Sequence, residues 1–238
     1  MIRPLFLLVL IGLAAPAAAA DRVFSVSSFD RVRVEGPFDV RLTVGGSPLA
    51  KASGDQRVIE DLDVRLEGTT LIVSAGQNDW AEQGQAHGPA PVITLSTLNL
   101  RSATVLSGGK LTIDGAVKAR QLDLQLTGSG VLGVSGIKAD QLNATLLGTG
   151  TIALAGDAAK ARLITSGPGS IAAASLATGD LNVRMDGTGE TEASARFTAA
   201  ATSTGLGRIV IHGNAACTVK ALAGGPILCG KDAPPPQP

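Results

Sequence analysis

The sequence predicts an all-β fold, a right-handed parallel β-helix with about 20 residues per coil. A glycine-rich motif recurs at nearly constant spacing, and apolar residues alternate with period two between the motifs. The composition also fits, because 45% of the 238 residues are hydrophobic, 30 are Gly, and only 3% are aromatic. Small apolar side chains suit many short strands separated by frequent turns.

The glycine motif marks the corner of each coil. Its first glycine stands at spacings of 20, 20, 19, 20 and 18 residues, at Gly108, Gly128, Gly148, Gly167, Gly187 and Gly205. Glycine is favoured where the backbone turns, because it takes positive φ without steric cost. Each period is therefore predicted to be one coil.

The residues between the corners alternate as strand residues do, and equivalent positions keep the same character in successive periods. We expect one set before the corner to face inward: Leu122, Leu124, Leu126; Leu142, Ala144, Leu146; Ala161, Leu163, Thr165; Leu181, Val183, Met185. A second inward set follows the corner: Leu111, Ile113; Leu132, Val134; Ile152, Leu154; Ile171, Ala173; Thr191, Ala193; Ile209, Ile211. Stacked coils align such residues into interior ladders.

Other folds fit less well. No window shows sustained helical spacing, and a β-propeller needs a period of about 40 residues. An antiparallel sandwich is the remaining rival, but Asp-Gly hairpin signals occur only at Asp114-Gly115 and Asp186-Gly187.

The two ends of the domain are expected to be less regular than its middle. Alternating runs lie at 32–34, 40–44, 62–66 and 71–73, as expected of terminal coils that close an exposed ladder. The segment from Ala75 to Pro91, which contains Trp80 and His87, has no period and is interpreted as a surface loop.

The first 20 residues match a secretory signal peptide, and we expect cleavage between Ala20 and Asp21. The apolar run from Leu5 to Ala15 has eleven residues, whereas a spanning helix needs about 20. We therefore expect an exported protein, periplasmic or secreted and associated with the cell surface, with no transmembrane segment in the mature chain. The predicted parts are a signal peptide (1–20), a β-helix domain (21–230) and a disordered Pro-rich tail (231–238).

The two cysteines, Cys217 and Cys229, are predicted to form a disulfide, because an even count in an exported chain favours one. We expect the segment that carries it to cover the last coil. Two thiols and two distant histidines, His87 and His212, are too few for a metal site. The corner glycines precede no helix that could bind a phosphate, so no cofactor is predicted.

The charge balance excludes a nucleic-acid partner, since Lys+Arg and Asp+Glu each number 20. One outward column on the strand before the corner is the candidate binding surface: Asp123, Asn143, Arg162 and Asn182. A second column beside it contains Gln125, Thr145, Ile164 and Arg184. These columns are either a solvated polar face or a strip that binds carbohydrate or protein.

A catalytic role is not predicted. A glycoside hydrolase needs two carboxylates roughly 5–10 Å apart, and one aspartate in the first column does not supply them. Glu190 and Glu192 point outward from one strand, but we expect no neighbouring column to give either a partner or burial. Gly133, Ala153 and Ala172 form a flat stripe of small side chains on the same face.

The N-terminal run resembles a known family. The residues 29–42 (FDRVRVEGPFDVRL), followed by Gly54-Asp55, 59–64 and 68–73, resemble the opening of the putative autotransporter adhesin head domain, or GIN domain. This is a family of unknown function in exported bacterial proteins, and the resemblance covers roughly residues 25 to 225. It implies an exported β-helical protein of the cell envelope.

From the residues and the resemblance together, the predicted function is a non-catalytic binding or scaffold module, with adhesion as one form of it. Its expected partner is an envelope protein or a polysaccharide. No C-terminal run of membrane strands follows the coils, so we expect periplasmic residence rather than self-translocation. The alternative function is a carbohydrate-active β-helix enzyme acting on polysaccharide.

Overall fold

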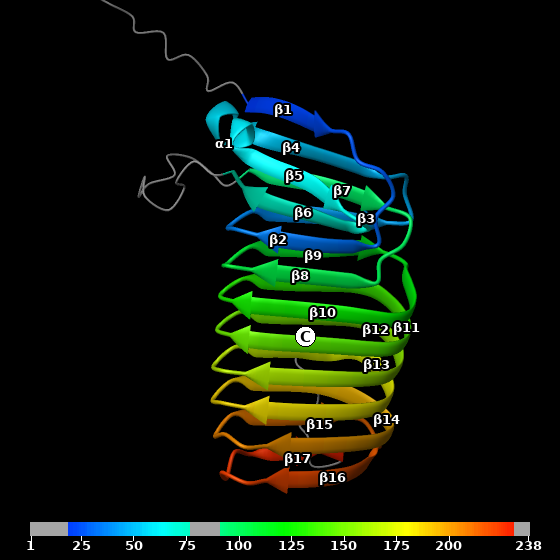
Figure 1. Cartoon of the computed structure of the whole chain (residues 1–238). Helices are drawn as coiled ribbons and strands as arrows, with labels where there is room; N and C mark the ends of the chain where they lie inside the picture. Colours follow the sequence, from blue (N-terminus) through cyan, green and yellow to red (C-terminus); the bar gives the residue numbers. More distant parts are fainter. Residues whose placement is uncertain (1–18, 77–90, 231–238) are drawn as a thin grey trace, which may run out of the picture.

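The chain forms a β-solenoid in which parallel strands stack coil upon coil (Figure 1). The computed structural model describes residues 19–76 and 91–230, and within them 17 strands join into one continuous sheet. In chain order the elements are β1 (Ala19–Phe24), β2 (Arg31–Glu35), β3 (Asp39–Val44), β4 (Leu49–Asp55), α1 (Gln56–Glu60), β5 (Leu62–Glu67), β6 (Thr70–Ala75), β7 (Val92–Thr97), β8 (Ser102–Leu106), β9 (Lys110–Gly115), β10 (Val117–Gly128), β11 (Val131–Gly148), β12 (Thr151–Ser166), β13 (Ser170–Asp186), β14 (Glu190–Ser203), β15 (Arg208–His212), β16 (Ala216–Ala221) and β17 (Ile227–Cys229). The predicted all-β solenoid is confirmed.

Two faces run along the solenoid. Face A is the part of the sheet formed by β6, β2, β8, the C-terminal parts of β10 to β14, and β16. Face B is the part formed by β7, β3, β9, the N-terminal parts of β11 to β14, β15 and β17. Each of the long strands β11 to β14 starts on face B, rounds a bend and ends on face A. Leu122 pairs with Leu142, 20 residues away, and Leu181 pairs with Ala199, 18 residues away. The coil length therefore matches the sequence period.

The interior consists of the predicted ladders. Leu124, Ala144, Leu163 and Val183 lie in register on four successive coils, and each is 2% exposed or less. All the other positions predicted to face inward are buried as well. Two of them are polar, and the hydroxyls of Thr165 and Thr191 lie 2.8 Å apart, so that each satisfies the other inside the core.

The two glycines of each corner differ in backbone conformation, but from the second coil onward both lie close to the preceding coil. Five of the six first glycines have positive φ, for example +104° at Gly128 and +124° at Gly148. The second glycine, such as Gly150, does not, but a Cβ there would lie 2.5 Å from the carbonyl oxygen of Gly130 in the preceding coil. The first glycines meet the same constraint, since a Cβ at Gly148 would lie 2.6 Å from the carbonyl oxygen of Gly128. Both glycines thus allow adjacent coils to approach to hydrogen-bond distance, a requirement that positive φ does not explain.

The first coils do not stack in chain order. On face A, β2 lies between β6 and β8, and on face B, β3 lies between β7 and β9. The coil made by β2 and β3 is therefore inserted between two coils that come later in the sequence. To reach β8, residues 98–101 pass by this coil, and the amide of Arg101 donates to the carbonyl of Asp30 at 2.7 Å.

Antiparallel strands cap the N-terminal end. β4 pairs antiparallel with β7, β1 with β4, and β5 with β6, as seen at the top of Figure 1. Arg22 of β1 donates to the carbonyl of Ile59 at the end of α1, at 3.1 Å. Hydrogen bonds from Lys51 and Ser53 of β4 lower the pKa of the Asp21 carboxyl.

At the C-terminal end, β16 and β17 form the last coil themselves. β16 pairs in parallel with β14 on face A, and β17 with β15 on face B. The predicted disulfide Cys217–Cys229 is present and joins these two strands across that coil. The expectation that the disulfide segment would cover the last coil is therefore wrong, because this segment has strand partners on both faces.

The predicted domain limits are only partly within the described residues. Residues 1–18, the tail 231–238, and most of the Ala75–Pro91 segment with Trp80 and His87 lie outside them. β1 begins at Ala19, two residues before the expected cleavage site. In the part of the chain that the structure describes, no helix has the length and apolar character needed to cross a membrane.

The close approach of the coils predicts a large penalty for Gly150→Ala. The added methyl group would lie against the Gly130 carbonyl and would force neighbouring coils apart, so we expect a loss of at least about 2 kcal/mol in unfolding free energy. Gly133→Ala is the matched control, because a Cβ there meets nothing within 4 Å and the φ of Gly133 is not positive. The control should change stability by less than about 0.5 kcal/mol in urea denaturation. Equal midpoints for the two variants would contradict this account of the corner.

The disulfide closes a loop with a sequence separation of 12 and is expected to stabilise the last coil. Replacing both cysteines by alanine should cost about 3 kcal/mol in the chain-entropy model. Hydrogen exchange should accelerate first at the amides of β16 and β17, while β11 and β12 stay protected as an internal reference. Unchanged exchange in the last coil would show that its other contacts suffice.

Candidate functional site: a polar strip on face A

The four residues of the predicted column lie in register on consecutive coils. Asp123 of β10 pairs with Asn143 of β11, Asn143 with Arg162 of β12, and Arg162 with Asn182 of β13. Neighbouring strands of a sheet are about 4.8 Å apart, so the column spans about 14 Å along the solenoid axis. We call these four residues the polar strip. The alternation of the strands places all four outward, because the residues on either side of each are in the core.

One end of the polar strip is tied up by its own hydrogen bonds. The amide of Asn143 donates to Oδ1 of Asp123 at 2.8 Å, and the amide of Gln121 donates to both carboxylate oxygens at 3.1 and 3.0 Å. Asp123 is therefore held as an acceptor for protein groups, and its carboxylate acts as a positioning group for Asn143.

The other end offers free donors. Arg162 and Asn182 are exposed, and neither forms a side-chain hydrogen bond or ion pair within residues 19–76 and 91–230. Beside them, Lys160 is also exposed and has no such partner among these residues. A guanidinium, an ammonium and an amide thus face solvent within two adjacent coils.

These groups line a shallow hollow of about 390 Å³ in face A. One wall of the hollow is formed by residues of the polar strip. The second wall is the column two residues before the strip, which contains Gln141, Lys160, Asp180 and Thr198 in register. The column of Gln125, Thr145, Ile164 and Arg184, which was expected beside the strip, lies on its other side. That column does not line the hollow, and its Arg184 is paired with Asp186 at 3.6 Å. The two-residue period of the strands could have identified this column, because its members stand two residues before the polar strip in each coil.

The side chains that line the hollow are mainly hydrogen-bonding groups. Its one carboxylate, that of Asp180, accepts a hydrogen bond from the hydroxyl of Thr198 at 2.7 Å. A pair of carboxylates at catalytic spacing is not among the residues that line it. Amides and cations at a regular spacing on a stiff sheet instead suit the hydroxyl and carboxylate groups of an extended ligand.

The expectation that Glu190 and Glu192 lack partners is wrong. Arg208, opposite Glu190 in the ladder, approaches it to 3.1 Å, and Nε2 of His212 lies 2.6 Å from Oε1 of Glu192. His212 is 8% exposed, so this contact is also partly removed from solvent. The partners come from β15, the next coil. The period that places Ile209 and Ile211 opposite Thr191 and Ala193 also places Arg208 opposite Glu190, whereas His212 reaches Glu192 diagonally from beyond Val210. Both carboxylates are thus engaged with side chains of the protein.

The stripe of small residues on face B is also in register. Gly133 pairs with Ala153, and Ala153 with Ala172, and together they line a second shallow hollow. Its ends are acidic, at Asp114 and Glu192. No group of three or more potential metal ligands occurs in the described part of the chain.

Solved structures share this fold. A putative adhesin from Bacteroides fragilis has a TM-score of 0.79 at 20% identity, covering 90% of this chain and 97% of that chain. A putative lipid binding protein from Parabacteroides distasonis has a TM-score of 0.71 at 18% identity, covering 90% and 97%. A putative adhesin from Parabacteroides merdae has a TM-score of 0.69 at 18% identity, with the same coverage. At these identities the likeness concerns the fold.

Sequence comparison identifies the family. No curated protein matches the chain. A family model matches residues 28–215, from the turn before β2 to the start of the last coil. Since this match covers most of the sequence, the chain belongs to the family described as "Putative auto-transporter adhesin, head GIN domain".

Proposed function

We propose that this protein is an exported, non-catalytic binding module of the bacterial cell envelope, and that its polar strip and the adjoining hollow contact an envelope polysaccharide. The observation that carries the proposal is that Lys160, Arg162 and Asn182, which have no side-chain partner among the described residues, surround one hollow on face A. Adhesion is the form of binding that the family description supports.

The geometry favours an extended polymer over a compact small molecule. The hollow is shallow, and its donors repeat along the solenoid axis with the spacing of the strands. Because the sheet fixes the spacing of the backbone before binding, the conformational entropy lost by the protein when a ligand docks is confined to these side chains. An envelope protein would have to present a matching edge of acceptors.

A substitution at Arg162 tests this surface. Arg162→Ala should weaken co-sedimentation with purified envelope polysaccharide about tenfold, which corresponds to about 1.4 kcal/mol, because it removes the guanidinium at the centre of the hollow. Arg184→Ala is the matched control: it removes an arginine from the same face but outside the hollow, and should change binding less than about twofold.

The same incubation tests the alternative of a carbohydrate-active enzyme. Under the proposal, the polysaccharide is recovered at its original length and without new reducing ends. Cleavage by the purified wild-type protein would overturn the non-catalytic assignment. Equal loss of binding in both arginine variants would instead overturn the assignment of the surface.

Export can be checked separately. We expect the protein recovered from its host to begin at Asp21, since small residues precede this position. The shortened β1 would keep the contacts of Asp21 with Lys51 and Ser53. Mass spectrometry of the intact protein reads this N-terminus directly, and recovery of a form that begins at Met1 in the cytosol would contradict the proposal.

A further inference from the structure

A further, larger depression lies where the chain leaves its regular winding. Residues 98–101 pass by the inserted coil of β2 and β3, and the depression opens between this crossover, residues 28–30 and the start of β10. It has a cavity volume of about 620 Å³, compared with about 390 Å³ for the hollow at the polar strip. This volume is within the roughly 300–1,000 Å³ of small-molecule sites.

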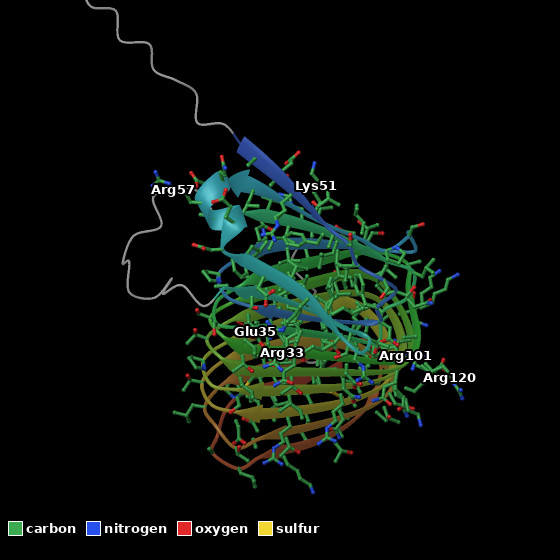
Figure 2. The ribbon with its side chains drawn as sticks, turned by 45° about the horizontal axis from the view of Figure 1, so that its top comes forward. Arg33, Glu35, Lys51, Arg57, Arg101 and Arg120 are labelled. Atoms are coloured by element: carbon green, nitrogen blue, oxygen red, sulfur yellow. A yellow bond between two sulfur atoms is a disulfide. The ribbon has the colours of Figure 1, made fainter. Side chains whose placement is uncertain are left out.

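Three cationic side chains line this depression: Arg101 from the crossover, and Lys118 and Arg120 from β10. Figure 2 shows Arg101 and Arg120 beside each other at one edge of the solenoid. Asp30 is the one acidic residue in the lining, and it approaches Arg101 at 3.3 Å. The lining therefore carries two positive charges in excess, in a chain whose formal net charge is zero.

Two of these cations, Lys118 and Arg120, form no ion pair within residues 19–76 and 91–230. The carboxylate nearest to them along the next coil is that of Asp140, which follows Ala139, the register partner of Ala119. Asp140 does not line the depression. The hydroxyls of Ser28 and Thr69 and the amide of Asn99 add neutral donors around the same space.

The backbone around the cations is fixed. The amide of Arg101 donates to the carbonyl of Asp30 at 2.7 Å, and the carbonyl of Arg101 accepts from the amide of Asp123 at 2.9 Å. The hydroxyl of Thr97 donates to the carbonyl of Phe29, which ties the start of the crossover to the segment before β2. The depression is therefore bounded by three chain segments that are hydrogen-bonded to one another.

From this arrangement we infer that the depression binds a phosphomonoester group. Such a group carries about −1.5 to −2 charges at pH 7, which matches the charge excess of the lining. Its three terminal oxygens can each accept from a different donor, and guanidinium groups bind phosphate through paired hydrogen bonds. A carboxylate or a phosphodiester, with one charge, would leave one cation uncompensated. The group can be borne by a sugar or by a lipid head group.

The test uses the full-length mature protein and small probes. In NMR titrations, inorganic phosphate and methyl phosphate should shift the amides of residues 97–101 and 118–121. Dimethyl phosphate should bind at least about fivefold more weakly, because it has one charge instead of two. Perturbations centred on the polar strip, or equal affinity for the monoester and the diester, would overturn the assignment.

Variants identify the side chains. The double variant Lys118→Met with Arg120→Gln should weaken methyl phosphate binding at least about tenfold through loss of charge-assisted hydrogen bonds. Lys138→Met is the matched control, because Lys138 is the register neighbour of Lys118 in the next coil and does not line the depression. It should change the affinity less than about twofold, as expected for an exposed charge outside the site. Equal effects would mean that only general surface charge is involved. Circular dichroism confirms that each variant is folded.

Two further probes distinguish a phosphate borne by a sugar from one borne by a lipid head group. Glucose 6-phosphate presents the group on a sugar, and phosphatidylcholine vesicles with added phosphatidic acid present it on a membrane. Binding of either probe that the double variant loses and the control keeps supports the inference and names the source. Binding of neither probe, together with no response to methyl phosphate, would refute it.

Discussion

The structure depends on one constraint, namely that successive coils lie at the hydrogen-bonding distance of a parallel sheet along their whole length. The corner glycines meet this constraint at the points of closest approach: a side chain at Gly150 would collide with the Gly130 carbonyl of the coil before it. The interior ladders meet it with apolar side chains in register, such as Leu124, Ala144 and Leu163. One coil alone could not bury these residues, so stability comes from the stack.

The same register that builds the core also arranges the surface. Residues that face outward at equivalent positions become columns about 4.8 Å apart, whether or not they are selected for binding. On face A this places Arg162 beside Asn143 and Asn182, and puts Lys160 in the neighbouring column. The regular part of the solenoid therefore offers a shallow, repetitive surface, whereas the larger depression lies where the crossover at residues 98–101 interrupts the winding.

The two ends of the stack are closed by different means. At the N-terminal end, β5 pairs antiparallel with β6 and β4 pairs antiparallel with β7, so that the outer edges of these two strands are covered, and β1 in turn pairs with β4. At the C-terminal end, the coil is formed by two short strands, of which β16 is exposed throughout, and the Cys217–Cys229 bond links them. A terminal coil has one neighbour instead of two, and a covalent link there compensates for the contacts it lacks.

The sequence by itself determined the fold class, the coil length, the inward positions, the disulfide pair and the family, since each of these depends on local period, spacing or a run of residues. It also placed Asp123, Asn143, Arg162 and Asn182 in one column, because a constant period fixes the register of regular coils.

Only the tertiary structure decided that β2 and β3 lie between later coils, that Gln141, Lys160, Asp180 and Thr198 form the second wall of the hollow, and that His212 meets Glu192. The His212–Glu192 contact joins two regular strands, but diagonally, because Val210 and not His212 lies opposite Glu192. The order of the first coils and the depression beside them depend on irregular segments, and the path of such a segment is set by pairings between distant residues. A repeat in the sequence carries no information about those pairings.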